Sequence, residues 1–171
     1  LNDWRINQIA NILLCVPTDG LNSLNEIDVN YVVVFVAGQK LDVQFEGKNL
    51  YLLGHGGDDA KAPWFVRISG QPIEKYLHSN EISKTNYFWN ETLLGKMIPY
   101  STLMYYNEQT KQQSSSYVPG FTPIFVKNMK YGFDSDTPLQ LVYASPSFYD
   151  ENKTMTSVFI YKINEEYTGN N

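Results

Sequence analysis

The sequence predicts an α/β fold, or the related mixed α+β class, in which helices flank a central sheet and a β-rich segment ends the chain. Apolar residues recur at three- and four-residue spacing from Trp4 to Val16, which predicts an amphipathic helix. Tyr31 to Val36 is an unbroken β-branched and aromatic run, as in a strand. Met155 to Ile163 alternates as a half-buried strand does. With 171 residues, 43% of them hydrophobic, the chain can bury a core without a disulfide or a metal.

The first half of the chain carries two more helix signals and a hairpin signal. Pro17 ends the first helix, and Thr18 to Ile27 predicts a second, shorter one. We expect the first helix to bury one face, made of Ile6, Ile9, Ala10, Leu13 and Leu14. The run from Tyr31 lacks polar alternation, so we expect a strand covered on both faces. Leu41 to Phe45 and Leu50 to Leu53 flank a turn-forming segment and predict a hairpin.

The rest of the chain predicts two helices and then strands. Asp58 or Asp59 caps a helix that runs to about Ile68, and Pro63 should kink it. Glu91 to Tyr106 predicts a long helix interrupted by Pro99. We expect a helix and strand core over residues 1–106, a polar loop over 107–122, and a β-rich segment over 123–171 in the same domain. Its strands are Ile124 to Val126, Leu139 to Ala144 and Met155 to Ile163.

Composition excludes several functions. The net charge is −5 and the sequence contains no basic patch, so we expect no nucleic-acid partner. The longest apolar run, Tyr31 to Ala37, falls far short of the ~20 residues that a membrane-spanning helix needs. The chain opens with Leu1 directly on a helical pattern, and we therefore expect a piece of a larger protein.

Few motifs carry chemistry by themselves. The glycine-rich segment around His55 is similar to a lipase oxyanion loop, but no Gly-x-Ser-x-Gly nucleophile elbow accompanies it. His55 and His78 have no metal-ligand spacing, and we expect no metal site made by this chain alone. Asp58 and Lys61 lie three apart at a helix start, where an exposed ion pair is the simplest interpretation. Asn-x-Thr sequons begin at Asn90 and Asn152.

Four stretches in order resemble the C-terminal soluble domain of the catalytic subunit of archaeal oligosaccharyltransferases. The most specific is Asp58-Asp59-Ala60-Lys61-Ala62-Pro63-Trp64-Phe65-Val66-Arg67-Ile68, which resembles the family's Asp-x-x-Lys-x-x-x-Met/Ile motif and the residues that trail it. The other three are Asn2 to Asn11, Ile27 to Val34 and Thr92 to Tyr106. The resemblance covers about residues 1–106.

The resemblance implies a membrane glycosyltransferase that moves an oligosaccharide from a dolichol phosphate carrier to the asparagine of Asn-x-Ser/Thr. It implies Mg or Mn, with ligands outside this chain, and a metal-binding transmembrane domain as the partner of this one. The full-length protein would lie in the cell membrane, with this domain on the extracellular side. The family's Trp-Trp-Asp motif and its metal-binding carboxylates are absent, so we expect no catalytic residue in this chain and no activity of the isolated chain.

Carried over by position, the resemblance assigns binding of the acceptor peptide to Asp58, Lys61 and Phe65. Asp59 replaces Asp58 if the helix register differs by one residue. Phe65 stands where the family has Met or Ile, and an aromatic ring is larger and flatter. In an extracellular domain Asn152 and Asn90 become glycosylation candidates, with Asn152 ahead because it sits in an expected turn. The rival interpretation is a self-standing extracytoplasmic protein-binding module without enzyme activity.

Overall fold

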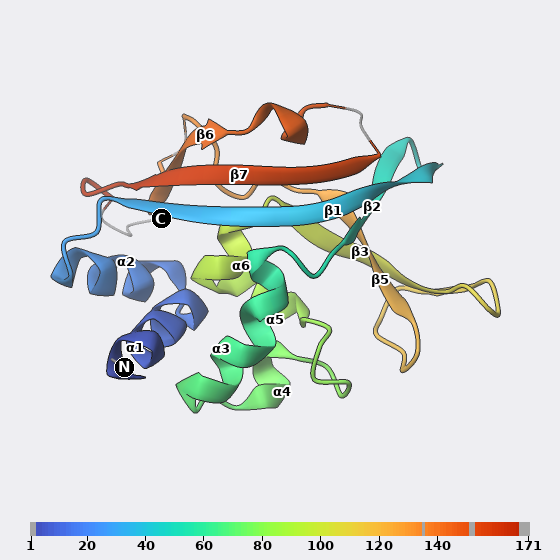
Figure 1. The fold of residues 1–171 in the computed structure, drawn as a ribbon, viewed down its shortest axis with the longest axis horizontal. Helices are drawn as coiled ribbons and strands as arrows, with labels where there is room; N and C mark the ends of the chain where they lie inside the picture. Colours follow the sequence, from blue (N-terminus) through green and yellow to red (C-terminus); the bar gives the residue numbers. More distant parts are fainter. Residues whose placement is uncertain (1–2, 135, 151–152, 168–171) are drawn as a thin grey trace.

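The computed structural model describes residues 3–134, 136–150 and 153–167. It is a mixed α+β fold built on one seven-stranded antiparallel sheet, which confirms the predicted class and the helix-flanked central sheet. The strand order is β4-β3-β5-β2-β1-β7-β6. The helices gather on one side of the long strands β1 and β7 (Figure 1). The chain therefore forms a sheet with one helix-covered face.

The elements follow one another along the chain with short connections. The helices are α1 (Asp3–Leu14), α2 (Pro17–Glu26), η1 (Asp58–Lys61, a 3₁₀ turn), α3 (Ala62–Ser69), α4 (Ile73–Tyr76), α5 (Asn86–Glu91), α6 (Leu93–Met97) and η2 (Pro146–Phe148, a 3₁₀ turn). The strands are β1 (Tyr31–Phe45), β2 (Lys48–Leu53), β3 (Tyr100–Asn107), β4 (Gln112–Ser114), β5 (Thr122–Lys127), β6 (Leu139–Ala144) and β7 (Thr154–Ile163).

The two N-terminal helices are confirmed, but the buried face of α1 is rotated from the predicted one. Pro17 occupies the first turn of α2, where its missing N–H costs nothing. In α1, Ala10 and Leu14 are buried as expected, together with Ile12. Ile6 and Ile9 are 37% and 47% exposed, so the prediction was wrong for these two residues.

Strand β1 is longer than predicted, and one of its faces is open. Val34 and Val36 point into the core, while Val33 is 58% exposed, so the expectation of cover on both faces was wrong. The apolar residues on its open face, such as Val33, fit the high β-propensity of branched side chains. The β1–β2 hairpin is confirmed. Its two turn residues, Glu46 and Gly47, both have positive φ, at 49° and 77°, as a tight type I′ turn requires.

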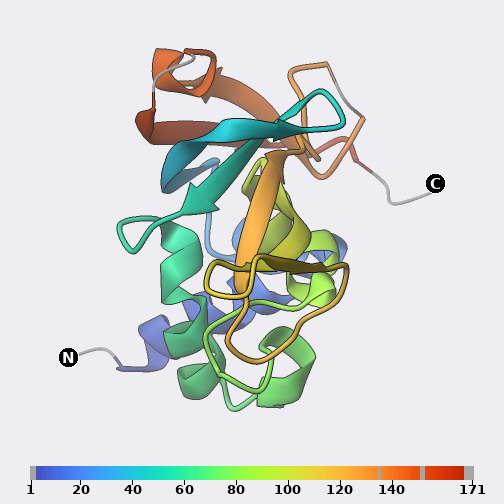
Figure 2. The same cartoon turned by 90° about the vertical axis from the view of Figure 1, so that its right-hand side faces the viewer.

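The two halves of the sheet are joined by a narrow contact between β2 and β5. Strands β1 and β7 pair continuously from Tyr31 with Lys162 to Gln39 with Thr154. Strands β2 and β5, by contrast, share the single pair Tyr51 and Phe125. Figure 2 shows β5 descending beside the helices while β1 and β2 cross the top of the molecule. The β3–β5 half of the sheet thereby becomes a side wall next to α5 and α6.

The predicted long helix from Glu91 to Tyr106 was wrong, because its residues form the end of α5, all of α6 and strand β3. Thr92 divides the two helices. Its hydroxyl donates to Phe88 O at 2.7 Å and accepts from Gly95 N at 2.9 Å, so it caps α6 while bonding back to α5. A Cβ at Gly95 would lie 1.9 Å from Phe88 O, so only glycine permits this close approach.

Helix α6 ends where Pro99 removes a donor, and a lysine from another element replaces it. Gly95 O would ordinarily accept from the N–H four residues on, which proline lacks. Lys130 Nζ donates to Gly95 O at 3.0 Å, to Ile98 O at 2.8 Å and to Tyr100 O at 2.6 Å. One half-buried ammonium group thus satisfies three carbonyls at the junction of α6 and β3.

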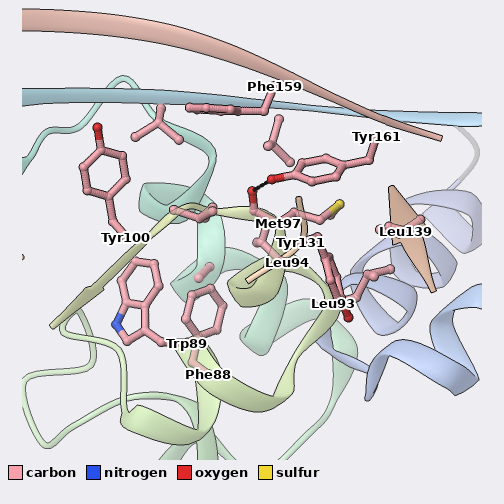
Figure 3. Packing of buried hydrophobic residues seen from close by; sticks show 14 of the residues in the cluster. Phe88, Trp89, Leu93, Leu94, Met97, Tyr100, Tyr131, Leu139, Phe159 and Tyr161 are labelled. Carbon is pink, nitrogen blue, oxygen red and sulfur yellow. Dashed lines mark hydrogen bonds between the residues drawn. The ribbon is translucent and has the colours of Figure 1, made fainter. Parts of the chain in front are cut away.

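The core lies between the sheet and the helices, and one buried tyrosine, Tyr161, joins the two layers by a hydrogen bond. Figure 3 shows Tyr161 of β7 pointing down onto α6, where its hydroxyl donates to Met97 O at 2.6 Å. The Tyr100 hydroxyl meets Met155 Sδ at 3.1 Å. Each aromatic ring therefore fills apolar space while its polar tip remains bonded.

The C-terminal predictions hold where the structure describes the chain. The three strands are confirmed as β5, β6 and β7, and β7 alternates as expected, with Phe159 and Tyr161 buried. The predicted polar loop contains the short strand β4. Asn152, the favoured glycosylation candidate, lies outside the described residues.

Candidate functional site

The candidate site is built on the loop that leaves β2 and runs along the open edge of β1. Strand β2 ends at Leu53, opposite Gly38, so the chain beyond it continues beside the earlier part of β1. Gly54 N donates to Ala37 O at 2.8 Å and extends the pairing by one bond. A Cβ at Gly57 would lie 3.1 Å from Ala37 N, so the glycines allow close approach to the strand. The role of these glycines is to let the loop pack closely against β1.

Asp58 fastens this loop to the sheet. Its Oδ2 accepts from Phe35 N at 2.7 Å, and its Oδ1 accepts from Lys61 Nζ at 2.8 Å. Phe35 N lies on the side of β1 that β2 does not reach, so the carboxylate satisfies an otherwise unpaired strand donor. Asp58 is therefore a structural anchor as well as a candidate binding residue.

The start of the motif helix differs from the prediction. Residues Asp58–Lys61 form a 3₁₀ turn whose N-cap residue is Gly57, so neither aspartate occupies the N-cap position. The α-helix proper begins at Ala62, which places Pro63 in its first turn. Proline is tolerated there because the first N–H groups have no partner within the helix. The predicted kink and the predicted aspartate cap were both wrong.

The motif residues sit on one side of this turn with unequal exposure. The Lys61 side chain is 58% exposed and that of Asp58 is 22% exposed. Phe65 is half-buried and packs against the core. Its neighbour Trp64 is 49% exposed, with the two ring centroids 5.5 Å apart. We call Asp58, Lys61, Trp64 and Phe65 the motif surface. Its exposed aromatic, Trp64, was missed from the sequence, although Trp64 stands at a helical spacing of three from Lys61.

Asp59 points the other way, into the molecule. Its side chain is 4% exposed, and Oδ2 lies 3.7 Å from Nζ of Lys84, whose side chain is 11% exposed. Burial raises the pKa of Asp59, and the charge of Lys84 opposes that shift. Burial lowers the pKa of Lys84, and Asp59 opposes that change. Asp59 thus does not share the surface of Lys61, and the register alternative loses its geometric basis.

A cavity of about 160 Å³ lies behind the motif surface, on the side of Asp59. The lining comes from the β2 end and the loop after it, η1, α3, the segment before α5, α5 itself, and strands β3 and β5. Its polar side chains are those of His55, Asp59, Ser83, Lys84, Trp89 and Thr102. A weak sequence signal for this cavity is the adjacent pair Asp58-Asp59, because neighbouring side chains in a 3₁₀ turn point in different directions.

Metal and membrane features are not found in the described ranges 3–134, 136–150 and 153–167. Within them, no group of three or more His, Cys, Asp or Glu side chains gathers as a metal site would require. None of the helices described there combines the length and apolar character needed to cross a bilayer.

No protein-family model matches this chain, and a search of curated proteins finds no significant match. The assignment of function therefore rests on the motif surface and its geometry.

The sequon at Asn90 should be refractory to glycosylation once the chain has folded. Asn90 lies in the last turn of α5, not at a helix start as expected, and is exposed. Thr92 is fully buried, with its hydroxyl bonded to Phe88 O and Gly95 N. A transferase that reads this hydroxyl would have to break both bonds. Mass spectrometry should find Asn90 bare after enzymatic glycosylation of folded protein and occupied after treatment of the denatured chain. Equal occupancy in both samples would contradict this.

Proposed function

We propose that this chain is the extracytoplasmic C-terminal domain of a membrane oligosaccharyltransferase and that its motif surface helps bind the acceptor sequon Asn-x-Ser/Thr. One observation carries the proposal. The Lys61 ammonium is exposed yet held 2.8 Å from Asp58, which is itself anchored to β1 through Phe35 N. An exposed ammonium group that is held in place by an anchored carboxylate is suited to binding, because the side chain loses little conformational freedom when a peptide docks.

The motif surface offers the groups that a sequon requires. Lys61 has three donors for peptide carbonyls or a hydroxyl oxygen, and only one of them is used by Asp58. Asp58 retains lone pairs that can accept from a serine or threonine hydroxyl. Trp64 and the half-buried Phe65 supply apolar contact for a threonine methyl. A site that bonds a hydroxyl on one side and packs on the other rejects residues lacking it.

The remaining parts of the reaction belong elsewhere in the proposed protein. Mg or Mn would be held by ligands outside the described residues, which contain no metal cluster. The lipid-linked oligosaccharide and the transmembrane domain are the proposed partners, with this domain on the extracellular side of the cell membrane. The isolated chain is proposed to have no transferase activity of its own.

Lys61→Ala tests the proposal in the full-length enzyme. We expect the rate at low peptide concentration to fall about three- to tenfold, mainly through a higher KM, since one charge-assisted contact is lost. The melting temperature should hardly change, because exposed ion pairs contribute under ~1 kcal/mol. Lys153→Ala is the matched control, since it breaks another exposed pair, with Asp42 at 3.3 Å. Equal rates for Lys61→Ala and the control would refute the motif surface as an acceptor site.

A second candidate, a self-standing extracytoplasmic protein-binding module, is favoured by the open face of the sheet. Tyr31 and Val33 of β1 and Val142 and Tyr143 of β6 are 41–58% exposed, and β7 lies between these two strands in the sheet. Such a module would show no dependence of glycosylation on Lys61, so the same assay separates the two candidates.

A further inference from the structure

We propose that the cavity behind the motif surface is a binding site for a small uncharged ligand whose polar group both donates and accepts hydrogen bonds. This inference is independent of the proposed function. It concerns the inner side of the η1 turn, where Asp59 and Lys84 lie, and not the exposed side of Lys61.

The inference begins with polar atoms that lack partners. In the part of the chain that the structure describes, three buried side-chain atoms make no hydrogen bond, and they are Asp59 Oδ1, Trp89 Nε1 and Thr102 Oγ1. All three residues line this one cavity. The Thr102 side chain also approaches the Tyr105 hydroxyl, and this contact opposes the rise that burial causes in the pKa of Tyr105. Buried polar groups in native proteins are nearly always paired, so three in one cavity favour a ligand with complementary polar groups.

The residues that carry these atoms are firmly held and deeply buried. Asp59 is 2% exposed and Trp89 is 1% exposed. The Trp89 ring packs against Phe88 and Phe125, with centroids 5.0 and 5.3 Å away. In Figure 3 its indole nitrogen is turned away from the Phe88 ring. The donor and the acceptor are therefore fixed in place before any ligand arrives.

The chemistry of the three atoms defines the ligand. Asp59 Oδ1 requires a donor, Trp89 Nε1 requires an acceptor, and Thr102 Oγ1 serves as either. Lys84 already balances the charge of Asp59, so a charged ligand would lose its hydration without gaining a counter-ion. Apolar walls from Leu53, Pro63 and Phe125 suit a short hydrocarbon stem.

The size of the cavity sets an upper limit on the ligand. At about 160 Å³ it is comparable to the cavity of ~150 Å³ that accepts a benzene molecule. A primary carboxamide or an alcohol with a stem of two or three carbons fits this space. For so few atoms we expect dissociation constants on the order of 1–10 mM.

The test uses the indole N–H resonances of the protein in nuclear magnetic resonance. Propionamide should shift the Trp89 Nε1–H signal in a saturable manner. The N–H signals of Trp4 and Trp64, which are 62% and 49% exposed, serve as internal controls and should remain unchanged. N,N-dimethylpropionamide has no donor for Asp59, and propionate carries a charge, so neither should saturate the Trp89 signal.

A variant then links the shift to the cavity. Thr102→Val removes the hydroxyl and keeps the shape, and it should weaken propionamide binding roughly three- to tenfold while leaving the exposed indole signals in place. Three results would overturn the inference. The absence of a saturable shift would mean that the cavity binds water alone. Equal binding of N,N-dimethylpropionamide would mean that the cavity is an apolar void. Preferred binding of propionate would mean an anion site at Lys84.

Discussion

Lys84→Met should lower the free energy of unfolding by about 3–5 kcal/mol at pH 7, because it leaves the Asp59 carboxylate buried without its counter-ion. For a chain of this length the melting temperature should fall by roughly 6–20 °C. Chemical denaturation followed by tryptophan fluorescence measures the change. Lys48→Met, at an exposed strand start, is the matched control and should shift stability by less than about 0.5 kcal/mol.

Two further measurements separate lost charge pairing from lost packing. Asp59→Asn combined with Lys84→Met should recover most of the stability, because the uncompensated charge is gone. In Lys84→Met alone, burial holds the pKa of Asp59 above its usual 3.8. A carboxyl group whose pKa is raised by folding contributes stability that is fully present at pH values below its pKa in the unfolded state. That stability is lost as the pH rises through its pKa in the folded state. The deficit of Lys84→Met should therefore shrink between pH 7 and pH 4. A deficit that is constant with pH would point to packing instead.

The second large effect is expected for Lys130→Met, which should lower the free energy of unfolding by about 3 kcal/mol. Its ammonium is the donor for Gly95 O, Ile98 O and Tyr100 O, and a methionine leaves these carbonyls short of partners at a helix end that Pro99 already deprives of one N–H. Its Nζ also lies 5.6 Å from the Trp89 ring centroid, a contact the variant loses. Denaturant unfolding of Lys130→Met beside Lys48→Met measures the effect, and equal midpoints would contradict it.

The difference in free energy of unfolding between the wild type and Lys130→Met should depend on pH. Burial lowers the pKa of Lys130 to about 7, and repulsion from Lys96 adds to the shift, while the three carbonyls favour the charged form. The unfolded chain then binds more protons than the folded one between pH 7 and 10, so wild-type stability gains from rising pH in that range. The difference in free energy of unfolding between the wild type and Lys130→Met should therefore increase from pH 7 to 9.5. A difference that does not change with pH would show that the carbonyls keep Lys130 charged throughout this range.

Patterns that act over short stretches of sequence predicted much of this fold. The helices α1 and α2, the β1–β2 hairpin and strand β7 follow from spacing, proline and turn residues, whose effects are local. The segment from Glu91 to Tyr106 shows the limit. Its leucines and methionines fit a helical pattern, but Thr92 and Pro99 cut it, and pairing with β5 makes Tyr100–Asn107 a strand. That pairing depends on residues that lie far away in sequence.

The site divides in the same way. The spacing of Asp58 and Lys61 predicted their contact, which the 3₁₀ turn preserves at 2.8 Å. The bond from Phe35 N to Asp58 could not be predicted, because it needs the loop to follow the edge of β1. Nor could the Asp59–Lys84 pair, which joins residues brought together only by the packing of η1 against the segment before α5. Long-range packing therefore decides which of two adjacent aspartates faces solvent.

The position of β7 in the sheet also orders the events of folding. This late strand lies between β1 and β6, and it pairs with β1 from Tyr31 opposite Lys162 to Gln39 opposite Thr154. At ribosomal rates of ~5–20 residues per second, β1 must wait roughly 6–26 s for the partner encoded about 130 residues later. Until then the edge of β1, which includes Val34 and Val36, stays unpaired and can bind chaperones or other nascent chains. Closing so large a loop also makes the β1–β7 pairing a slow step in refolding.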